Sequence, residues 1–333
     1  MRALVFKRYG KSAKPEYLDL EAPVPGPDEI LVRVHAVGLN PIDNMIPKGT
    51  FKSVLKFKLP ATIGSDVSGD VVAVGKSVTR FKIGDEIYAS VFDLSRGTLA
   101  DYAVVPQSAA ALKPANIDFV QAASIPMVGL TSWQALKERG RLASGQKIFI
   151  PAGSGGIGTF AIQLAKAMGA IVGTTTSTGN VALVKGLGAD EVVDYKQQQF
   201  ESVLRGYDMV LGTMRGDSIE KSIQVLKPKG LIVSLIGPLD AAFAQARGMN
   251  GLFRFVFGLM SRKIMRMAKK RDVHYSFLFV RPDGGQLAEI GKLIEAGKSR
   301  PVIDRVFEFD QAREALDYLE AGRAKGKVVV KLL

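Results

Sequence analysis

The segment 153–158 has the residue types and the spacing of a phosphate-binding loop. It reads Gly-Ser-Gly-Gly-Ile-Gly, a GxGxxG pattern, directly after a predicted strand at 147–152 and directly before a predicted helix at 157–168. Glycines at these positions permit a tight turn and let the backbone approach a pyrophosphate, whose charge is met by the free amides of the following helix. The segment therefore predicts dinucleotide binding, through Gly153, Ser154, Gly155, Gly156, Ile157 and Gly158.

The residues about 20 positions after this loop bear on which dinucleotide binds, because NAD-specific loops usually place an acidic residue there for the ribose 2′-hydroxyl. This chain has hydroxyls and an amide instead. With no carboxylate to repel a 2′-phosphate, the pattern favours NADPH over NADH. No Arg or Lys lies beside these residues to bind the phosphate, and the nearest cation is Lys185. The alternative is that the threonines only end a β-branched strand. The predicted contacts are Thr176, Ser177, Thr178 and Asn180.

Metal-ligating and thiol residues are scarce. The chain has no cysteine and two histidines, His35 and His274, so it can form neither a disulfide nor a thiolate nucleophile. A cysteine-ligated zinc site is impossible, and a catalytic zinc site with three protein ligands is hard to build. We interpret both histidines as structural and predict no metal cofactor.

The elements that must position the loop follow from the pattern of the whole chain. Up to about residue 120, short β-like runs at 30–36, 67–74 and 86–91 alternate with Gly- and Pro-rich turns, which favours an antiparallel β domain. Strand-like runs at 147–152, 171–175, 191–195, 207–211, 231–236 and 275–280 then alternate with helical segments, which predicts βαβ units and a parallel sheet. The C-terminal segment has β-like runs at 302–309 and 327–333 around a predicted helix at 311–321. Its sequence pattern resembles that of the first third of the chain more than that of the middle.

A chain of 333 residues holds about two domains. We predict an α/β, doubly wound parallel (Rossmann) domain at 123–285, inserted into a mostly antiparallel β domain that is formed by 1–122 and 286–333. A basic helical insertion is expected at about 239–274.

Several short motifs give the sequence a family resemblance over essentially its whole length. They are Gly38–Asp43, Gly64–Gly69, Gly84–Asp85, Gly97–Tyr102, Gly129–Thr131 and the loop at Ala152–Gly158. With them the chain resembles the zinc-independent, zeta-crystallin-like quinone oxidoreductases of the medium-chain dehydrogenase/reductase superfamily. It is most similar to the enone or alkenal reductase-like and chloroplast-envelope quinone oxidoreductase homologues. The resemblance implies a GroES-like first domain and a homodimer.

The same resemblance implies an activity: NADPH-dependent, metal-independent reduction of quinones or α,β-unsaturated carbonyls (enones or alkenals) by hydride transfer. Zinc-dependent relatives carry metal ligands where this chain has residues 40–43 and 64–66. The resemblance implies Asn40 and Thr131 as catalytic residues, and Ile42, Asp43, Met45, Phe51 and Phe279 as the substrate pocket. Further cofactor contacts would be Tyr195, Ile236, Leu278, Val280 and Lys327.

The positions of Met45 and Phe51 depart from the family pattern, because related quinone and enoyl-thioester reductases have tyrosines there. Without those hydroxyls, protonation is expected to come from water. An acyl-thioester substrate is disfavoured, and an enoyl-thioester reductase is kept as an alternative. Asn40 and Asp43 have a simpler alternative role, as turn-forming and capping residues after a strand.

The net charge of +13 is concentrated in one segment. Residues 247–271 contain eight cations and no acid; without these eight, 37 basic residues face 32 acidic ones. Phe253, Val256, Met260, Ile264 and Met267 recur there at helical spacing, which predicts an amphipathic helix. Three interpretations remain open: a solvated lid over the substrate pocket, a contact with an anionic membrane surface, or nucleic-acid binding, the least favoured because no nucleic-acid motif accompanies the charge.

A second class of function follows from this segment: a nucleotide-binding protein that acts mainly through 247–271 on a membrane or RNA. Lys7 and Arg8 interrupt the first apolar run before it reaches signal-peptide length, and no uncharged apolar run has membrane-spanning length. We therefore expect a cytoplasmic protein, with peripheral membrane contact as the alternative. The expected partner of the site is a small electrophilic substrate.

Overall fold

The protein is described by a computed structural model that covers residues 1–10 and 13–333. It divides into two units. Unit 1 comprises Met1–Leu130 and Val280–Leu333, and unit 2 comprises Thr131–Phe279. The chain therefore crosses between units at 130/131 and 279/280, where the sequence predicted 122/123 and 285/286.

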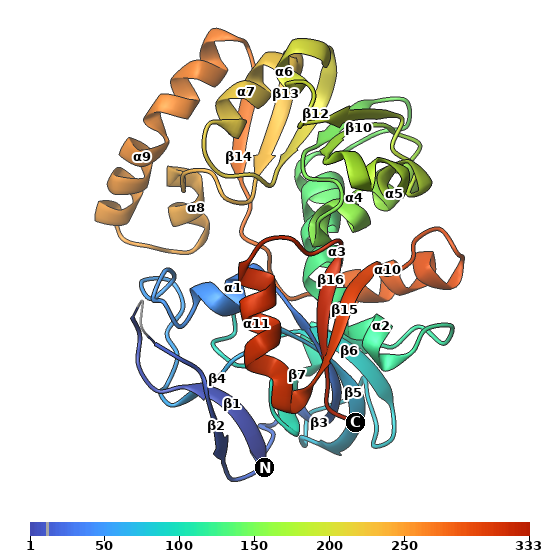
Figure 1. Ribbon diagram of the computed structural model, residues 1–333. Helices are drawn as coiled ribbons and strands as arrows, with labels where there is room; N and C mark the ends of the chain where they lie inside the picture. The colour runs from blue at the N-terminus through green and yellow to red at the C-terminus, as the bar shows by residue number, and fades with distance from the viewer. Residues whose placement is uncertain (11–12) are drawn as a thin grey trace. The chain divides into compact units, whose positions relative to one another are not determined.

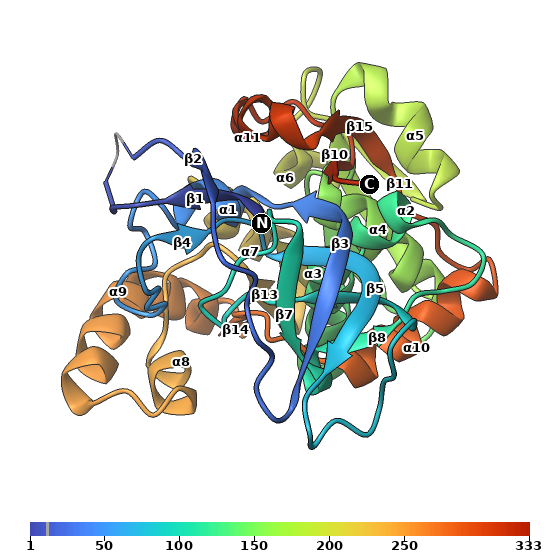
Figure 2. The same ribbon diagram turned by 90° about the horizontal axis from the view of Figure 1, so that it is seen from below.

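Unit 1 is built on a mostly antiparallel sheet with the order β15-β16-β3-β5-β6-β8, in which β7 also pairs with β3. Burial alternates along β3, because one face of the strand packs on the core while the other is more open. Figure 2 shows β7, β3 and β5 side by side. The strands are β3 (Glu29–Leu39), β5 (Asp66–Val74), β6 (Glu86–Ser90), β7 (Tyr102–Pro106), β8 (Ala110–Leu112), β15 (Ile303–Glu308) and β16 (Lys327–Lys331).

The C-terminal strands return to this sheet, as the sequence predicted. β16 pairs antiparallel with β3, in a register that sets Val328 opposite Leu39 and Val330 opposite Val37. A smaller sheet joins β2 (Glu16–Asp19), β1 (Arg2–Phe6) and β4 (Ala61–Thr62). The helices of unit 1 are α1 (Pro41–Met45), α2 (Phe119–Ala123), α10 (Gly284–Glu295) and α11 (Ala312–Glu320).

Unit 2 contains a six-stranded, wholly parallel sheet with the order β11-β10-β9-β12-β13-β14. The order reverses at β9, so the carboxyl end of this strand lies at a topological switch point, where α/β sheets bind their ligands. The strands are β9 (Lys147–Ile150), β10 (Ile171–Thr176), β11 (Glu191–Asp194), β12 (Tyr207–Gly212), β13 (Leu226–Ser234) and β14 (His274–Phe277).

The helices of unit 2 connect these strands in the βαβ manner that the sequence predicted. They are α4 (Gly156–Ala167), α5 (Val181–Gly186), α6 (Phe200–Val203), α7 (Ser218–Val225), α8 (Ala241–Ala246) and α9 (Gly251–Lys270). A further helix, α3 (Pro126–Trp133), runs across the boundary between the units. The predicted basic insertion corresponds to α8 and α9, which Figure 1 shows at the β14 end of the sheet, with α9 in orange. No helix within the described ranges combines the length and the apolar character needed to cross a bilayer.

Candidate functional site

The glycine loop leaves β9 at its carboxyl end and turns into α4. Ala152 adopts a positive φ of 56°, and the amides of Ala152 and Gly153 donate to the Thr175 hydroxyl and carbonyl oxygens at 3.0 and 2.9 Å. These bonds anchor the turn to the neighbouring strand β10. Gly155 then occupies the N-cap of α4, with a φ of −80°.

The three glycines of the GxGxxG pattern have different structural surroundings. A Cβ atom on Gly153 would lie 2.1 Å from the Thr174 hydroxyl oxygen, and one on Gly158 would lie 2.4 Å from the Ala152 carbonyl oxygen. The fold itself excludes a side chain at both. A Cβ on Gly155 would meet only the Ala152 carbonyl oxygen, at 3.4 Å, and would otherwise project into open space in front of α4.

This open space is the cradle that a dinucleotide pyrophosphate requires. Backbone approach is unobstructed at Gly155, and the first amides of a twelve-residue helix face the same point. The residues present therefore fit a dinucleotide cofactor.

Four of the predicted cofactor residues form one hydrogen-bonded group beside the loop. The Thr176 hydroxyl donates to Ser154 Oγ at 3.0 Å, and the Asn180 amide donates to Ser154 Oγ and to Ser177 Oγ at 3.3 and 3.2 Å. The structure thus brings Ser154 of the loop together with Thr176, Ser177 and Asn180 of the later segment.

Asp194 is a residue that sequence reasoning missed. It ends β11 in register with Thr176, and its carboxylate accepts the Thr178 hydroxyl at 2.5 Å. That hydrogen bond holds the pKa of Asp194 below its usual range, so the group is ionised at neutral pH. The Lys196 amide and the Gln197 side chain also donate to it. An acid at the end of the next predicted strand, 191–195, was the available signal, since neighbouring parallel strands end at one sheet edge.

The remaining predicted cofactor residues lie in varied surroundings. Tyr195 is 60% exposed after β11, Ile236 is exposed after β13, and Leu278 is buried. The predicted strand at 275–280 ends earlier, at Phe277. Leu278 still donates its amide to Ser234, but the next residues leave the sheet as the chain enters unit 1.

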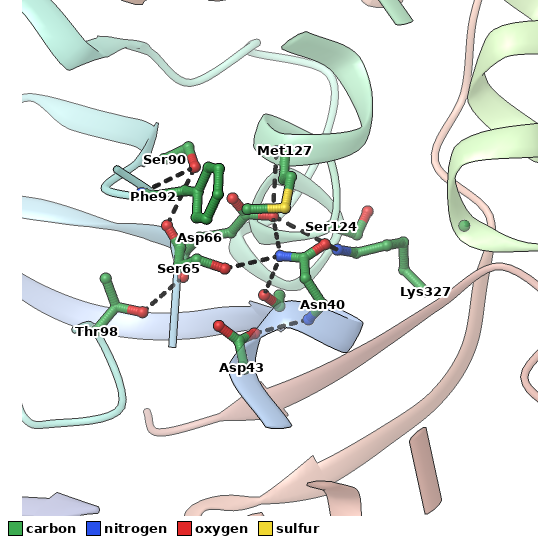
Figure 3. Close-up of polar contacts among 12 residues, drawn as sticks. Asn40, Asp43, Ser65, Asp66, Ser90, Phe92, Thr98, Ser124, Met127 and Lys327 are labelled. Atoms are coloured by element: carbon green, nitrogen blue, oxygen red, sulfur yellow. Dashed lines mark hydrogen bonds and ion pairs between the residues drawn. The ribbon is translucent and has the colours of Figure 1, made fainter. Parts of the chain in front are cut away.

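A buried polar cluster lies in unit 1, where β3 runs into α1 (Figure 3). The Asn40 amide nitrogen donates to Asp66 Oδ2 at 2.9 Å, to Ser65 Oγ at 3.1 Å and to the Gly38 carbonyl at 3.3 Å. Its amide oxygen accepts from Lys327 Nζ at 2.5 Å. The predicted catalytic residue Asn40 is therefore hydrogen-bonded at both ends of its amide group.

Two carboxylates and one ammonium group share this cluster, and each side chain is nearly fully buried. Lys327 Nζ lies 3.5 Å from Asp66 Oδ2, and Asp43 accepts the Asn40 backbone amide at 2.7 Å, the capping role that the sequence offered as an alternative. Burial raises the pKa of Asp43 to about 7, raises that of Asp66 and lowers that of Lys327. One oxygen of each carboxylate has no hydrogen-bond partner among the described residues.

The donor set of the cluster does not fit a zinc ion. The sequence holds no cysteine, and within residues 1–10 and 13–333 no three His, Asp or Glu side chains gather to ligate a metal. The Lys327 ammonium already lies beside Asp66, so the positive charge at this point comes from a side chain. Lys327, expected to contact the cofactor, contacts Asn40 and Asp66 inside this cluster.

The other predicted site residues are distributed over both units. Ile42 and Met45 are half-buried on α1, and Phe51 is half-buried after it. Thr131 is buried on α3 at the start of unit 2. Phe279 packs against Phe243 with ring centroids 5.6 Å apart.

Comparison with known proteins identifies both units. Residues 26–115 match the family described as alcohol dehydrogenase GroES-like domain, and residues 187–330 match the family described as zinc-binding dehydrogenase. The chain is 35% identical to the mitochondrial NAD(P)H oxidoreductase RTN4IP1 of Danio rerio, over 100% of this chain and 92% of that protein. It is 34% identical to the chloroplastic NADPH-dependent alkenal/one oxidoreductase of Arabidopsis thaliana, over 99% of this chain and 79% of that protein.

A solved structure agrees with these relatives. The quinone oxidoreductase from Coxiella burnetii matches with a TM-score of 0.85 and 31% identity, over 100% of this chain and 99% of that one. The predicted resemblance and the two-domain fold are thereby confirmed. The chain belongs to the medium-chain dehydrogenase/reductase superfamily, has quinone oxidoreductases and an alkenal/one oxidoreductase among its homologues, and is a nicotinamide-dependent oxidoreductase.

Proposed function

We propose that this protein reduces quinones or α,β-unsaturated carbonyls with NADPH and without a metal ion. The observation that carries the proposal is the open cradle at Gly155, in front of α4 and at the switch point of the parallel sheet. The relatives support the substrate class, since one acts on alkenals and enones by name and another on quinones.

The preference for NADPH rests on the group beside the loop. Ser154, Ser177 and Asn180 present hydroxyl and amide groups to a ribose phosphate. Asp194 is ionised nearby, but Thr178, Lys196 and Gln197 donate to its oxygens. Calorimetric titration with NADPH and NADH tests this preference: tighter NADPH binding is expected, and tighter NADH binding contradicts it.

The chemistry divides between the cofactor and the chain. A bound reduced nicotinamide supplies the hydride. The chain must orient the acceptor and stabilise negative charge on its oxygen as the carbon is reduced. Because the Asn40 amide is used within the buried cluster, we assign the donor role to the Thr131 hydroxyl and a positioning role to Asn40. Met45 and Phe51 carry no ionisable hydrogen, so water supplies the proton.

The test is a panel of acceptors, with loss of nicotinamide absorbance as the readout. Quinones, enones and alkenals are compared with simple aldehydes, with an enoyl thioester and, in reverse, with alcohols plus NADP⁺. We expect turnover with the conjugated acceptors, unchanged by a metal chelator. Turnover confined to alcohols or simple aldehydes, or lost with the chelator, overturns the proposal, and a preference for the thioester supports the alternative substrate class.

We also propose a homodimer that forms through unit 2. β14 ends the strand order of the parallel sheet, and its outer edge has no partner strand within the described ranges. Sedimentation at several concentrations tests the assembly, and a monomer at all of them refutes it.

A further inference from the structure

Helix α9 presents an apolar surface that nothing in unit 2 covers. Its inner side packs against the unit through Phe257, Ser261, Ile264 and Ala268, all buried. On the other side the large apolar side chains in the first half of the helix are exposed. They are Leu252, Phe255, Val256, Leu259 and Met260.

The spacing of these exposed residues defines one continuous stripe, the α9 stripe. The steps from Leu252 through Phe255 and Val256 to Leu259 and Met260 are those of neighbours on one helix face. Leu252 is 68% exposed, Phe255 65% and Leu259 50%. Scattered single apolar residues are ordinary on a protein surface, but a contiguous set of large ones marks a site of interaction.

The same outward face becomes cationic in the second half of the helix. A period of 3.6 residues continues the line of the α9 stripe to Lys263, Arg266 and Lys270, all exposed, with Arg262 and Lys269 beside them. Lys263 forms an ion pair with Glu220 of α7 at 3.1 Å. No acidic residue occurs between 247 and 271, so the helix contributes no negative charge of its own to this face.

We propose that the α9 stripe and its cations bind the surface of an anionic lipid bilayer. Exposed Leu and Phe side chains enter the acyl boundary, and the cations next to them meet anionic headgroups. The charge of the helix selects this occupant, because a helix face that is apolar at one end and carries an excess of cations at the other matches an anionic interface. A second copy that docked its own α9 stripe here would bring the same cations and repel; the proposed homodimer uses the edge of β14. The helix lies on the membrane and does not cross it.

The experiment is flotation of the full chain with two kinds of vesicle. One kind is phosphatidylcholine alone, and the other contains one third phosphatidylglycerol. We expect flotation with the anionic vesicles only. Raising the salt from about 0.1 M to about 1 M shortens the screening length from about 10 Å to about 3 Å and should release the protein.

Two pairs of variants separate the contributions. Arg266→Gln with Lys270→Gln should lower binding to anionic vesicles about 25-fold, because each cation near such a surface contributes about a factor of five. Its control, Lys76→Gln with Lys298→Gln, removes two exposed cations elsewhere and should leave binding unchanged. Leu252→Ser with Phe255→Ser should lower it at least about tenfold, and the control Ile83→Ser, at a 65% exposed site in unit 1, should not.

Each variant is checked for its fold by circular dichroism and for NADPH binding, so a failure of the membrane proposal is distinct from a failure of the proposed function. The proposal is overturned if the intact protein does not float, if neutral vesicles bind equally well, or if the α9 variants float as well as their controls. Loss of self-association in the Ser variant, without vesicle binding by the intact protein, would assign the stripe to a second copy instead. RNA binding without vesicle binding also overturns it.

Discussion

Substitutions at two of the three loop glycines should have opposite effects: one should weaken cofactor binding and the other should lower the stability of the fold. Gly155→Val adds a Cβ atom whose one neighbour within 4 Å is the Ala152 carbonyl oxygen, at 3.4 Å. The backbone at this N-cap, with a φ of −80°, accepts any residue. We expect the free energy of unfolding to change by no more than about 1 kcal/mol, the scale of an N-cap substitution.

The effect of Gly155→Val on the cofactor should be large. Its isopropyl group fills the space that the pyrophosphate requires and displaces the phosphates from the first amides of α4. Two lost hydrogen bonds to a charged group, each worth about 1.5 kcal/mol, weaken NADPH binding roughly 100-fold.

Gly158→Ala should act in the reverse way. Its Cβ would lie 2.4 Å from the Ala152 carbonyl oxygen and 2.7 Å from Gly153 Cα. Both neighbours are backbone atoms, so the loop must move, at a cost of about 2 kcal/mol or more. This variant should lose stability even without cofactor.

Calorimetric titration with NADPH and urea denaturation of the cofactor-free protein measure the two effects. Gly186→Val is the matched control, because Gly186 lies on α5 in the same unit and an added Cβ there has no atom within 4 Å. It should keep the NADPH affinity. Unchanged NADPH affinity in Gly155→Val, or unchanged stability in Gly158→Ala, would refute the reasoning.

The buried cluster of unit 1 yields two further predictions. Lys327→Met leaves Asp66 without its cation and should destabilise the protein by about 3–5 kcal/mol at neutral pH. Part of this loss should be recovered when Asp66→Asn is added, as urea denaturation of the single and double variants would show. A cost of Lys327→Met below about 1 kcal/mol contradicts the ion pair. Burial raises the pKa of Asp43 from 3.8 to about 7, so its contribution to stability is full below pH 4 and is lost as the pH rises through 7. Asp43→Asn should therefore gain up to roughly 4 kcal/mol relative to the unchanged protein over this interval, and parallel stability curves for the two proteins would contradict the raised pKa.

The sequence predicted the fold well where local pattern and packing agree. The parallel strands at 147–152, 171–175 and 207–211 were visible as apolar runs between helical segments, and β9, β10 and β12 follow them closely. The glycine loop could be predicted equally well, since pyrophosphate binding requires glycine at fixed spacing.

Contacts between distant segments could not be predicted in this way. Lys327 meets Asn40 across 287 residues of sequence, because the pairing of β16 with β3 sets Val328 opposite Leu39. Only that register brings the two side chains together. Asp194 reaches Thr178 for a similar reason, through the parallel pairing of β11 with β10.

The face of α9 that packs against unit 2 also could not be predicted from the sequence pattern. Phe253, Val256, Met260, Ile264 and Met267 recur at helical spacing and so indicated one apolar face, but Val256 and Met260 are exposed while Phe257 and Ala268 are buried. Apart from Arg254 and two glycines, the first half of the helix consists of large apolar residues, so periodicity alone does not select the packed face. The presence of a helix within the basic insertion could be predicted from the sequence.

The central claim is that hydride passes from NADPH to the conjugated carbon of the acceptor. NADPH deuterated at the transferred position, with an enone as acceptor, tests it by mass spectrometry and NMR of the product. We predict one deuterium at the β-carbon of a saturated ketone, with a solvent hydrogen at the α-carbon. Deuterium at the carbonyl carbon of an allylic alcohol, or a product without deuterium, would contradict the proposed reaction.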